Sequence, residues 1–167
     1  NEREYIRDFF SIGGNNISLS TIGLNGLGDQ NDAAHVSFDF QQPGYVKRVG
    51  DKLYINLHLN KSLPGEKAPA DRQQLIEGDY HYEDRSITTF TVPEGYKVTY
   101  VPESAEKSWP EFGIKVHYNV DGNQVRVHKT IYSDYLYLGK DKFPTWNNFL
   151  DAVNAIQQQS LTLTKIN

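Results

Sequence analysis

The 167-residue sequence contains no cysteine and no methionine, and its longest apolar runs span three or four residues. The absence of cysteine excludes thiol nucleophiles, disulfides and cysteine-ligated zinc within this chain. The short apolar runs exclude a transmembrane helix, because spanning a bilayer requires about 20 apolar residues. The absence of methionine, also at position 1, predicts a piece of a longer protein, and its polar start lacks the apolar core of a signal peptide.

An excess of basic residues is also missing, because the formal net charge is −4 at pH 7. Nucleic acid is therefore not an expected partner, since binding to phosphates requires a basic face. Apolar residues make up 38% of the chain and charged residues 23%. This composition is that of a globular domain rather than a disordered one. We expect a single domain over residues 1–167 that does not insert into membranes.

Most of the chain alternates between apolar and polar residues, which is typical of strands with one buried face. The spacing of these short segments predicts an antiparallel β-sandwich of the immunoglobulin or fibronectin-like kind. The expected strands lie near residues 18–23, 36–40, 45–49, 53–59, 85–92, 96–101, 112–120, 125–131 and 161–165.

The segment Asp121-Gly122-Asn123 separates two alternating runs and predicts a tight hairpin, favouring a type I′ turn. The centre of the turn decides the position of two histidines. A turn centred on Gly122-Asn123 places His117 directly opposite His128, and a turn centred on Asp121-Gly122 makes them diagonal neighbours.

Two segments have helical rather than strand-like spacing. Trp146, Phe149, Leu150, Val153 and Ile156 predict an amphipathic helix over about residues 144–159, with its aromatic face toward the sheet. Near the start, the apolar residues of segment 3–10 predict a short helix that folds only by docking.

Residues for catalysis or metal binding do not form a recognisable pattern. There is no Gly-x-Ser-x-Gly motif. The adjacent carboxylates Glu83 and Asp84 would face opposite sides of a strand, so they do not form a glycosidase pair. His58 and His81 are expected at outward strand positions, and no third ligand is placed beside the pair His117 and His128. We expect no catalytic residue, no metal and no cofactor. A small hydrolase is the remaining catalytic alternative.

Aromatic residues are concentrated in the second half of the chain. Exposed aromatic side chains on a sandwich can stack on sugar rings or contact a protein partner. The candidate binding residues are therefore Trp109, Tyr132, Tyr135 and Tyr137. The alternative is that these aromatics form the contact between the C-terminal helix and the sheet, because the cluster leads directly into that helix.

The stretch Arg85–Val101, read as RSITTFTVPEGYKVTYV and followed by Pro102, resembles the strand, Pro-x-Gly-Tyr, strand element of one family. This family is the C-terminal domain of unknown function that follows the transglutaminase-like core in Bacteroidetes transglutaminase-like proteins. The later hairpin, the helix and the final Leu-Thr-Leu-Thr-Lys strand continue the resemblance over about residues 80–167.

The resemblance implies the tail of a larger exported protein, periplasmic or at the cell surface, whose Cys-His-Asp chemistry belongs to the preceding core. It transfers no catalytic residue to this chain. The implied role is a non-catalytic accessory domain that packs on the core or recruits a substrate or partner, with residues 1–12 as a connection from that core. The alternative is a glycan- or protein-binding module of the cell envelope.

Overall fold

A computed structural model describes residues 17–26, 33–61 and 63–166. The chain divides into two compact units between Lys47 and Arg48. The helix expected at residues 3–10 lies outside the described residues. Within the described part of the chain, no helix is long and apolar enough to cross a membrane.

The first unit contains one antiparallel hairpin, formed by β1 (Ser18–Asn25) and β2 (His35–Gln41). The alternation predicted for β2 is present, because its apolar residues are half-buried and the residues between them are exposed. The register shifts between Ser20 and Gly23 in β1. At this bulge Thr21 adopts a φ of +50°, a left-handed conformation that is uncommon for a residue other than glycine.

The second unit is built on a long antiparallel sheet with the strand order β6-β10-β9-β8. A smaller sheet has the order β3-β4-β12-β7, and β5 pairs with β11 alone. The strands of the long sheet are β6 (Tyr82–Thr91), β10 (Gln124–Ser133), β9 (Phe112–Asp121) and β8 (Ala105–Ser108). Those of the small sheet are β3 (Lys47–Val49), β4 (Lys52–Ile55), β12 (Leu161–Lys165) and β7 (Tyr96–Tyr100). The short pair is β5 (Ile76–Glu77) and β11 (Tyr137–Leu138).

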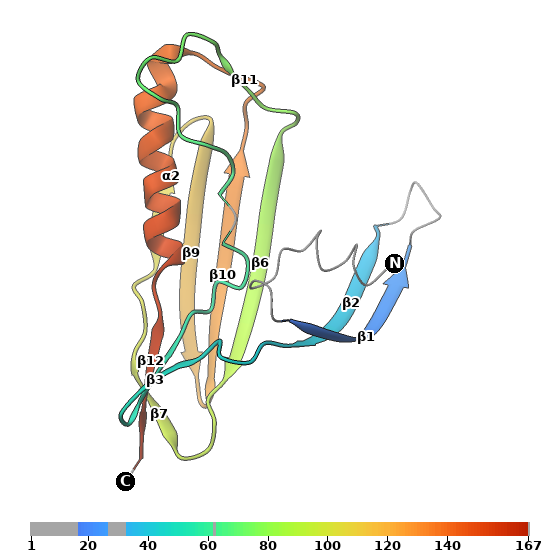
Figure 1. Ribbon diagram of the computed structural model, residues 1–167, viewed down its shortest axis with the longest axis vertical. Coiled ribbons are helices and arrows are strands. Elements are labelled where there is room, and N and C mark those ends of the chain that lie inside the picture. Colours follow the sequence, from blue (N-terminus) through green and yellow to red (C-terminus); the bar gives the residue numbers. More distant parts are fainter. Residues whose placement is uncertain (1–16, 27–32, 62, 167) are drawn as a thin grey trace. The chain divides into compact units, whose positions relative to one another are not determined.

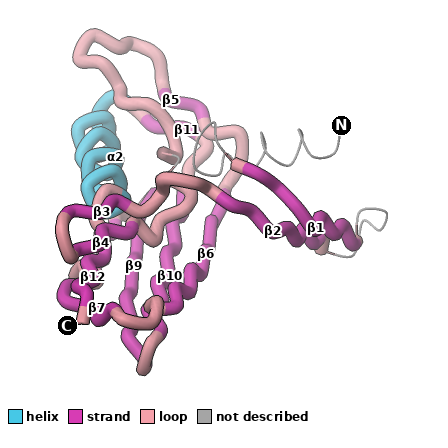
Figure 2. Tube along the Cα trace, turned by 60° about the horizontal axis from the view of Figure 1, so that its bottom comes forward, coloured by secondary structure: helices cyan, strands magenta, loops and turns pink. Residues whose placement is uncertain are grey.

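One helix, α2 (Phe143–Gln157), follows a 3-10 turn, η1 (Lys140–Lys142), and leads into β12. Figures 1 and 2 show α2 beside β9, with the small sheet beyond the end of the helix that leads into β12. The mainly β, antiparallel fold with one C-terminal amphipathic helix is confirmed. The helix and the small sheet lie on the β9 side of the long sheet, in a sandwich-like arrangement (Figures 1 and 2).

The hairpin between β9 and β10 has a two-residue turn at Gly122-Asn123, because Asp121 pairs with Gln124. His117 therefore lies directly opposite His128, as one of the two predicted registers requires. Only Gly122 has a positive φ, +56°. The turn is thus of the II′ kind, which needs glycine at its first central position, rather than the I′ kind favoured from the sequence.

The core lies between the long sheet and α2, and aromatic rings dominate it. The ring centroids of Phe112 on β9 and Phe149 on α2 are 4.8 Å apart, and those of Phe112 and Trp146 are 5.2 Å apart. The rings of Trp146, Phe149 and Phe112 are all fully buried. We call the rings of Trp109, Phe112, Tyr135, Trp146 and Phe149 the aromatic seam. The predicted inward face of the helix is confirmed.

Phe112→Ala is expected to lower the free energy of unfolding by about 3–5 kcal/mol, because it leaves a cavity at the centre of the aromatic seam. Urea unfolding followed by circular dichroism measures the change. Tyr137→Ala is the control, since this side chain is 67% exposed, and it should change stability by about 0.5 kcal/mol or less. Equal losses in both variants would contradict the central place of Phe112.

Gln157, at the end of α2, is 1% exposed. Neither its side-chain oxygen nor its side-chain nitrogen has a hydrogen-bond partner in the described structure. Burying an amide without partners costs about 1–3 kcal/mol. Gln157→Met keeps the length of the side chain and removes this cost, so the free energy of unfolding should rise by about 1 kcal/mol. Unfolding by urea checks it, with the exposed Gln158→Met as control, and a loss of stability in Gln157→Met alone would refute it.

Candidate functional site

A cluster of polar side chains is buried on the inner face of the long sheet. His58 is 2% exposed and Lys129, on β10, is 3% exposed. The Nε2 atom of His58 lies 2.8 Å from the hydroxyl of Tyr118, a residue of β9. The ammonium of Lys129 donates a hydrogen bond of 2.8 Å to the backbone carbonyl of Asn60. Inside the fold, these polar groups therefore form hydrogen bonds with one another or with the backbone.

The chain places His58 inside because β4 stops early. The side-chain oxygen of Asn56 accepts a hydrogen bond of 2.8 Å from the backbone N–H of His58. The Asn56 amide donates one of 2.8 Å to the carbonyl of Gln157. The strand expected over residues 53–59 therefore ends at Ile55, and the outward position expected for His58 is wrong. Asparagine side chains often replace ladder hydrogen bonds in this way.

Burial controls the charge of this polar cluster. Burial, with the positive charges of Lys129 and Lys61, lowers the pKa of His58 to about 4. Burial also lowers the pKa of Lys129, and Asp84 opposes that shift. Burial raises the pKa of Tyr118 to about 12, with Tyr100 adding to the shift. At neutral pH His58 is therefore a neutral imidazole in contact with the Tyr118 hydroxyl. With so low a pKa it is a weak base, and its contacts are structural.

The four aromatic residues predicted to bind a ligand do not share one surface. Trp109 lies in the aromatic seam, 5.8 Å from Phe149 by ring centroids. Tyr135 is 8% exposed and its ring lies 5.4 Å from that of Trp146. These two residues form the helix–sheet contact that was the alternative interpretation.

Tyr132 and Tyr137 lie elsewhere. Tyr132 is half-buried over Gly113 on the outer face of the long sheet. Its hydroxyl donates a hydrogen bond of 2.9 Å to the carbonyl of Trp109 and lies 2.7 Å from the Ser108 hydroxyl. Tyr137 of β11 is 67% exposed. Tyr132 therefore contacts Trp109 through the backbone carbonyl of Trp109, and Tyr137 lies on a separate strand, β11.

An open cleft of about 420 Å³ lies at the end of the fold where β5 pairs with β11. It is lined by residues 63–66, residues 76–80, Tyr82, Ser133, Tyr135 and Trp146, and we call it the aromatic cleft. Tyr80 and Tyr82 meet edge to face with ring centroids 6.0 Å apart, and Tyr80 is 65% exposed. Its size lies within the range of sites for small ligands.

Three contacts hold the wall of the aromatic cleft in place. The indole N–H of Trp146 donates a hydrogen bond of 2.9 Å to the carbonyl of Glu66. Gly65 lies so close to the same indole that a Cβ there would come within 2.8 Å of the ring. On the other side, the backbone N–H of Gly78 donates to the carbonyl of Leu136 at 2.9 Å. The cleft is therefore tied to the aromatic seam.

The carboxylates of Glu66, Glu77 and Asp79 add negative charge to the aromatic cleft. The lining contains no lysine, arginine or histidine. None of the three carboxylates belongs to an ion pair within the described residues. Burial raises the pKa of Tyr82 to about 12, so this tyrosine remains neutral at physiological pH.

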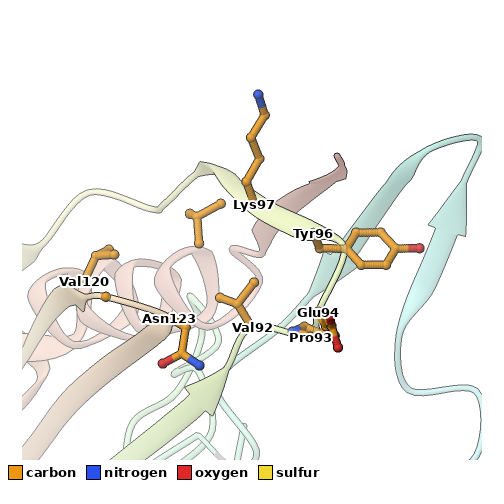
Figure 3. A pocket seen from close by; sticks show the side chains of 9 residues that line it. Val92, Pro93, Glu94, Tyr96, Lys97, Val120 and Asn123 are labelled. Atoms are coloured by element: carbon orange, nitrogen blue, oxygen red, sulfur yellow. The ribbon is translucent and has the colours of Figure 1, made fainter. Parts of the chain in front are cut away.

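A larger cleft, of about 580 Å³, lies at the opposite end of the long sheet, beside the β9–β10 turn. Figure 3 shows Val92, Val120 and Asn123 around it, with Tyr96 and Lys97 on β7. Its lining is mainly apolar, and it carries one acid, Glu94, and one base. A third cleft, of about 470 Å³, lies where Arg72 and Lys140 line the start of α2. None of these three clefts is lined by His58, Tyr118 or Lys129.

The paired histidines supply two imidazoles on the outer face of the long sheet. His117 lies 3.3 Å from the hydroxyl of Ser104 through its Nδ1 atom. Across the described ranges, no three histidine, aspartate or glutamate side chains are grouped closely enough to hold a metal ion. Zinc sites in proteins use at least three protein ligands, so the pair alone is an incomplete site.

The fold and the clefts define a β-rich domain with one C-terminal helix and an open aromatic surface. A family model matches residues 51–163, and the chain belongs to this family, DUF3858, a domain of unknown function. No curated protein and no solved structure matches the chain.

The buried imidazole predicts a pH dependence of stability. Because the pKa of His58 is about 4 in the fold and about 6.5 in the unfolded chain, the unfolded chain takes up the proton first. The stabilisation is complete above pH 6.5 and is lost as the pH falls toward 4. Between pH 7.5 and 5 this corresponds to about 2 kcal/mol.

Urea unfolding of the wild type and of His58→Gln at both pH values measures this loss, since glutamine does not titrate. The wild type should lose about 2 kcal/mol more than the variant. The exposed His128→Gln is the matched control and should behave as the wild type. Equal losses in the wild type and His58→Gln would contradict a depressed pKa.

Proposed function

We propose that this chain is a non-catalytic accessory domain of a larger exported transglutaminase-like protein. In this proposal it packs on the preceding core or recruits a substrate or partner for it. Membership of DUF3858 over residues 51–163 supports the proposal. The resemblance of residues 85–101 to the tail domain of such proteins supports the transglutaminase-like context and export.

The observation that carries the proposal is the contrast between the buried polar cluster and the aromatic cleft. Two groups suited to proton transfer, His58 and Lys129, are 2% and 3% exposed and are engaged inside the fold. The exposed His81 is paired with Asp134 at 2.5 Å and lines none of the three clefts. The open surface instead offers an exposed tyrosine, Tyr80, beside carboxylates. Aromatic side chains in concave sites serve recognition. The arrangement favours binding over turnover.

Calorimetric titration of the chain into the separately expressed core tests the proposal, together with the activity of the core with and without the chain. We expect saturable binding or a changed activity. Truncating an aromatic contact residue weakens such interactions strongly, so Tyr80→Ala should reduce the effect about fivefold or more. Tyr137→Ala, an equally exposed tyrosine outside the aromatic cleft, is the control.

The proposal fails if the chain neither binds the core nor alters its activity. In that case the second candidate, a glycan- or protein-binding module of the cell envelope, takes its place, because an open aromatic cleft also suits a ligand other than the core. Screens against glycans and envelope proteins then identify the ligand, with Tyr80→Ala as the variant that removes binding.

A further inference from the structure

We propose that the aromatic cleft binds the cationic side chain of a lysine or arginine residue presented by a peptide segment of the partner. This inference deepens the proposed function, and rests on it for the presence of such a partner. It names the chemistry that the cleft selects. Three features of the cleft support this assignment: the hydrogen-bonding capacity of the lining, its charge and its exposed ring.

The hydrogen-bonding groups that line the aromatic cleft are mainly acceptors. Glu66, Glu77 and Asp79 carry carboxylates, which accept hydrogen bonds and donate none when ionised. The one nitrogen donor among the lining side chains, the indole N–H of Trp146, is already used by the Glu66 carbonyl. Ammonium and guanidinium groups donate hydrogen bonds and accept none, so they complement this lining.

The charge of the lining agrees with its hydrogen bonding. The three carboxylates are all exposed, and none is neutralised by an ion pair in the described part of the chain. Lys67, the residue that follows Glu66, is already engaged, since its ammonium contacts Asp151 at 2.5 Å. A concave surface lined by charges of one sign concentrates ligands of the opposite sign.

The ring of Tyr80 is the third feature of the cleft that suits a cation. It is 65% exposed, it contacts Tyr82 edge to face, and it lines the same cleft as the three carboxylates. A cation above the face of a tyrosine is attracted by the ring electrons, and the aliphatic part of a lysine or arginine side chain packs on such a ring. Carboxylates beside an accessible aromatic ring therefore suit a cationic side chain better than an acidic or neutral one.

A sugar is a weaker fit to the same lining. Its hydroxyl groups both donate and accept hydrogen bonds, and their acceptor capacity would need donors beyond the tyrosine and Ser133 hydroxyls of the cleft. The lining contains no asparagine, glutamine or arginine side chain to supply them. Neutral oligosaccharides are therefore the comparison ligand in the test.

The test is a titration of the full chain with acetyl-Gly-Lys-Gly-amide and acetyl-Gly-Arg-Gly-amide, followed by chemical-shift changes in NMR spectra. Norleucine replaces lysine in a matched peptide that keeps the aliphatic chain and removes the charge. We expect the norleucine peptide to bind about fivefold more weakly or worse, and added salt to weaken the cationic peptides. The shifts should centre on Tyr80 and Tyr82.

Variants of the aromatic cleft locate the binding. Tyr80→Ala removes the ring and Asp79→Asn removes one charge, and each should weaken the cationic peptides about two- to fivefold. Both side chains are exposed, so folding is not the reason for a loss. The matched controls, Tyr137→Ala and Glu94→Gln, lie outside this lining and should leave binding unchanged.

Three results would overturn the inference: equal binding of the norleucine peptide, binding of a neutral oligosaccharide in preference to the cationic peptides, or binding that Tyr80→Ala and Asp79→Asn leave unchanged. The outcome is separable from that of the proposed function. If the chain binds or activates the core without binding cationic peptides, the function stands and this inference fails. If it binds these peptides through the cleft but does not affect the core, the inference stands and the core-associated role fails.

Discussion

The stacking of Phe112 against Trp146 and Phe149 is the contact on which the second unit depends. It joins the long sheet to α2, and its rings are buried completely. The position of the helix then fixes two further parts of the fold. Through the indole N–H of Trp146 it holds the loop at Glu66, and through its last turn it leads directly into β12. The aromatic seam therefore supports both the small sheet and the wall of the aromatic cleft.

The same packing places basic and acidic side chains in different environments, with His58 and Lys129 buried and the carboxylates of the aromatic cleft exposed. The long sheet turns its inner face, with Lys129, toward the interior, where the Tyr118 hydroxyl and the Asn60 carbonyl are the partners of the His58 and Lys129 side chains. Burial keeps His58 uncharged and so avoids a second cation beside this lysine. The carboxylates of the aromatic cleft stay in water, where their charge costs little. The polar side chains of the interior are thus held by hydrogen bonds, and the open aromatic cleft with its carboxylates lies at the end of the fold.

The long strands and the helix could be predicted from the sequence because each has one continuous buried face. Helix α2 begins at Phe143, one residue before the predicted start, and the alternation over 112–120 and 125–131 matches β9 and β10. The burial of His58 could not be predicted. It depends on the Asn56 side chain, which ends β4 by bonding to backbone groups 2 and 101 residues away.

The aromatic cleft could not be predicted from the sequence either, for a related reason. Tyr80 stands close to Glu77 and Asp79 in the sequence, but Glu66, Tyr135 and Trp146 of the lining come from distant segments. Strands β5 and β11 pair beside the cleft. Each of these strands is two residues long, and so short a strand carries no periodic pattern. Gly65 and Gly78 read as ordinary loop glycines, although each lies against an aromatic side chain of the seam. Proximity in the fold, rather than any motif, creates the site.

The strand order of the small sheet has a consequence for the order in which the chain folds during synthesis. β12 lies between β4 and β7, and its register joins Leu163 to Leu53. The β9–β10 hairpin closes over two residues and can form as soon as it leaves the ribosome, because short loops close fastest. β4 and β7 wait for a central strand that is synthesised more than a hundred residues after β4. Until then, both strands leave backbone groups open to other chains.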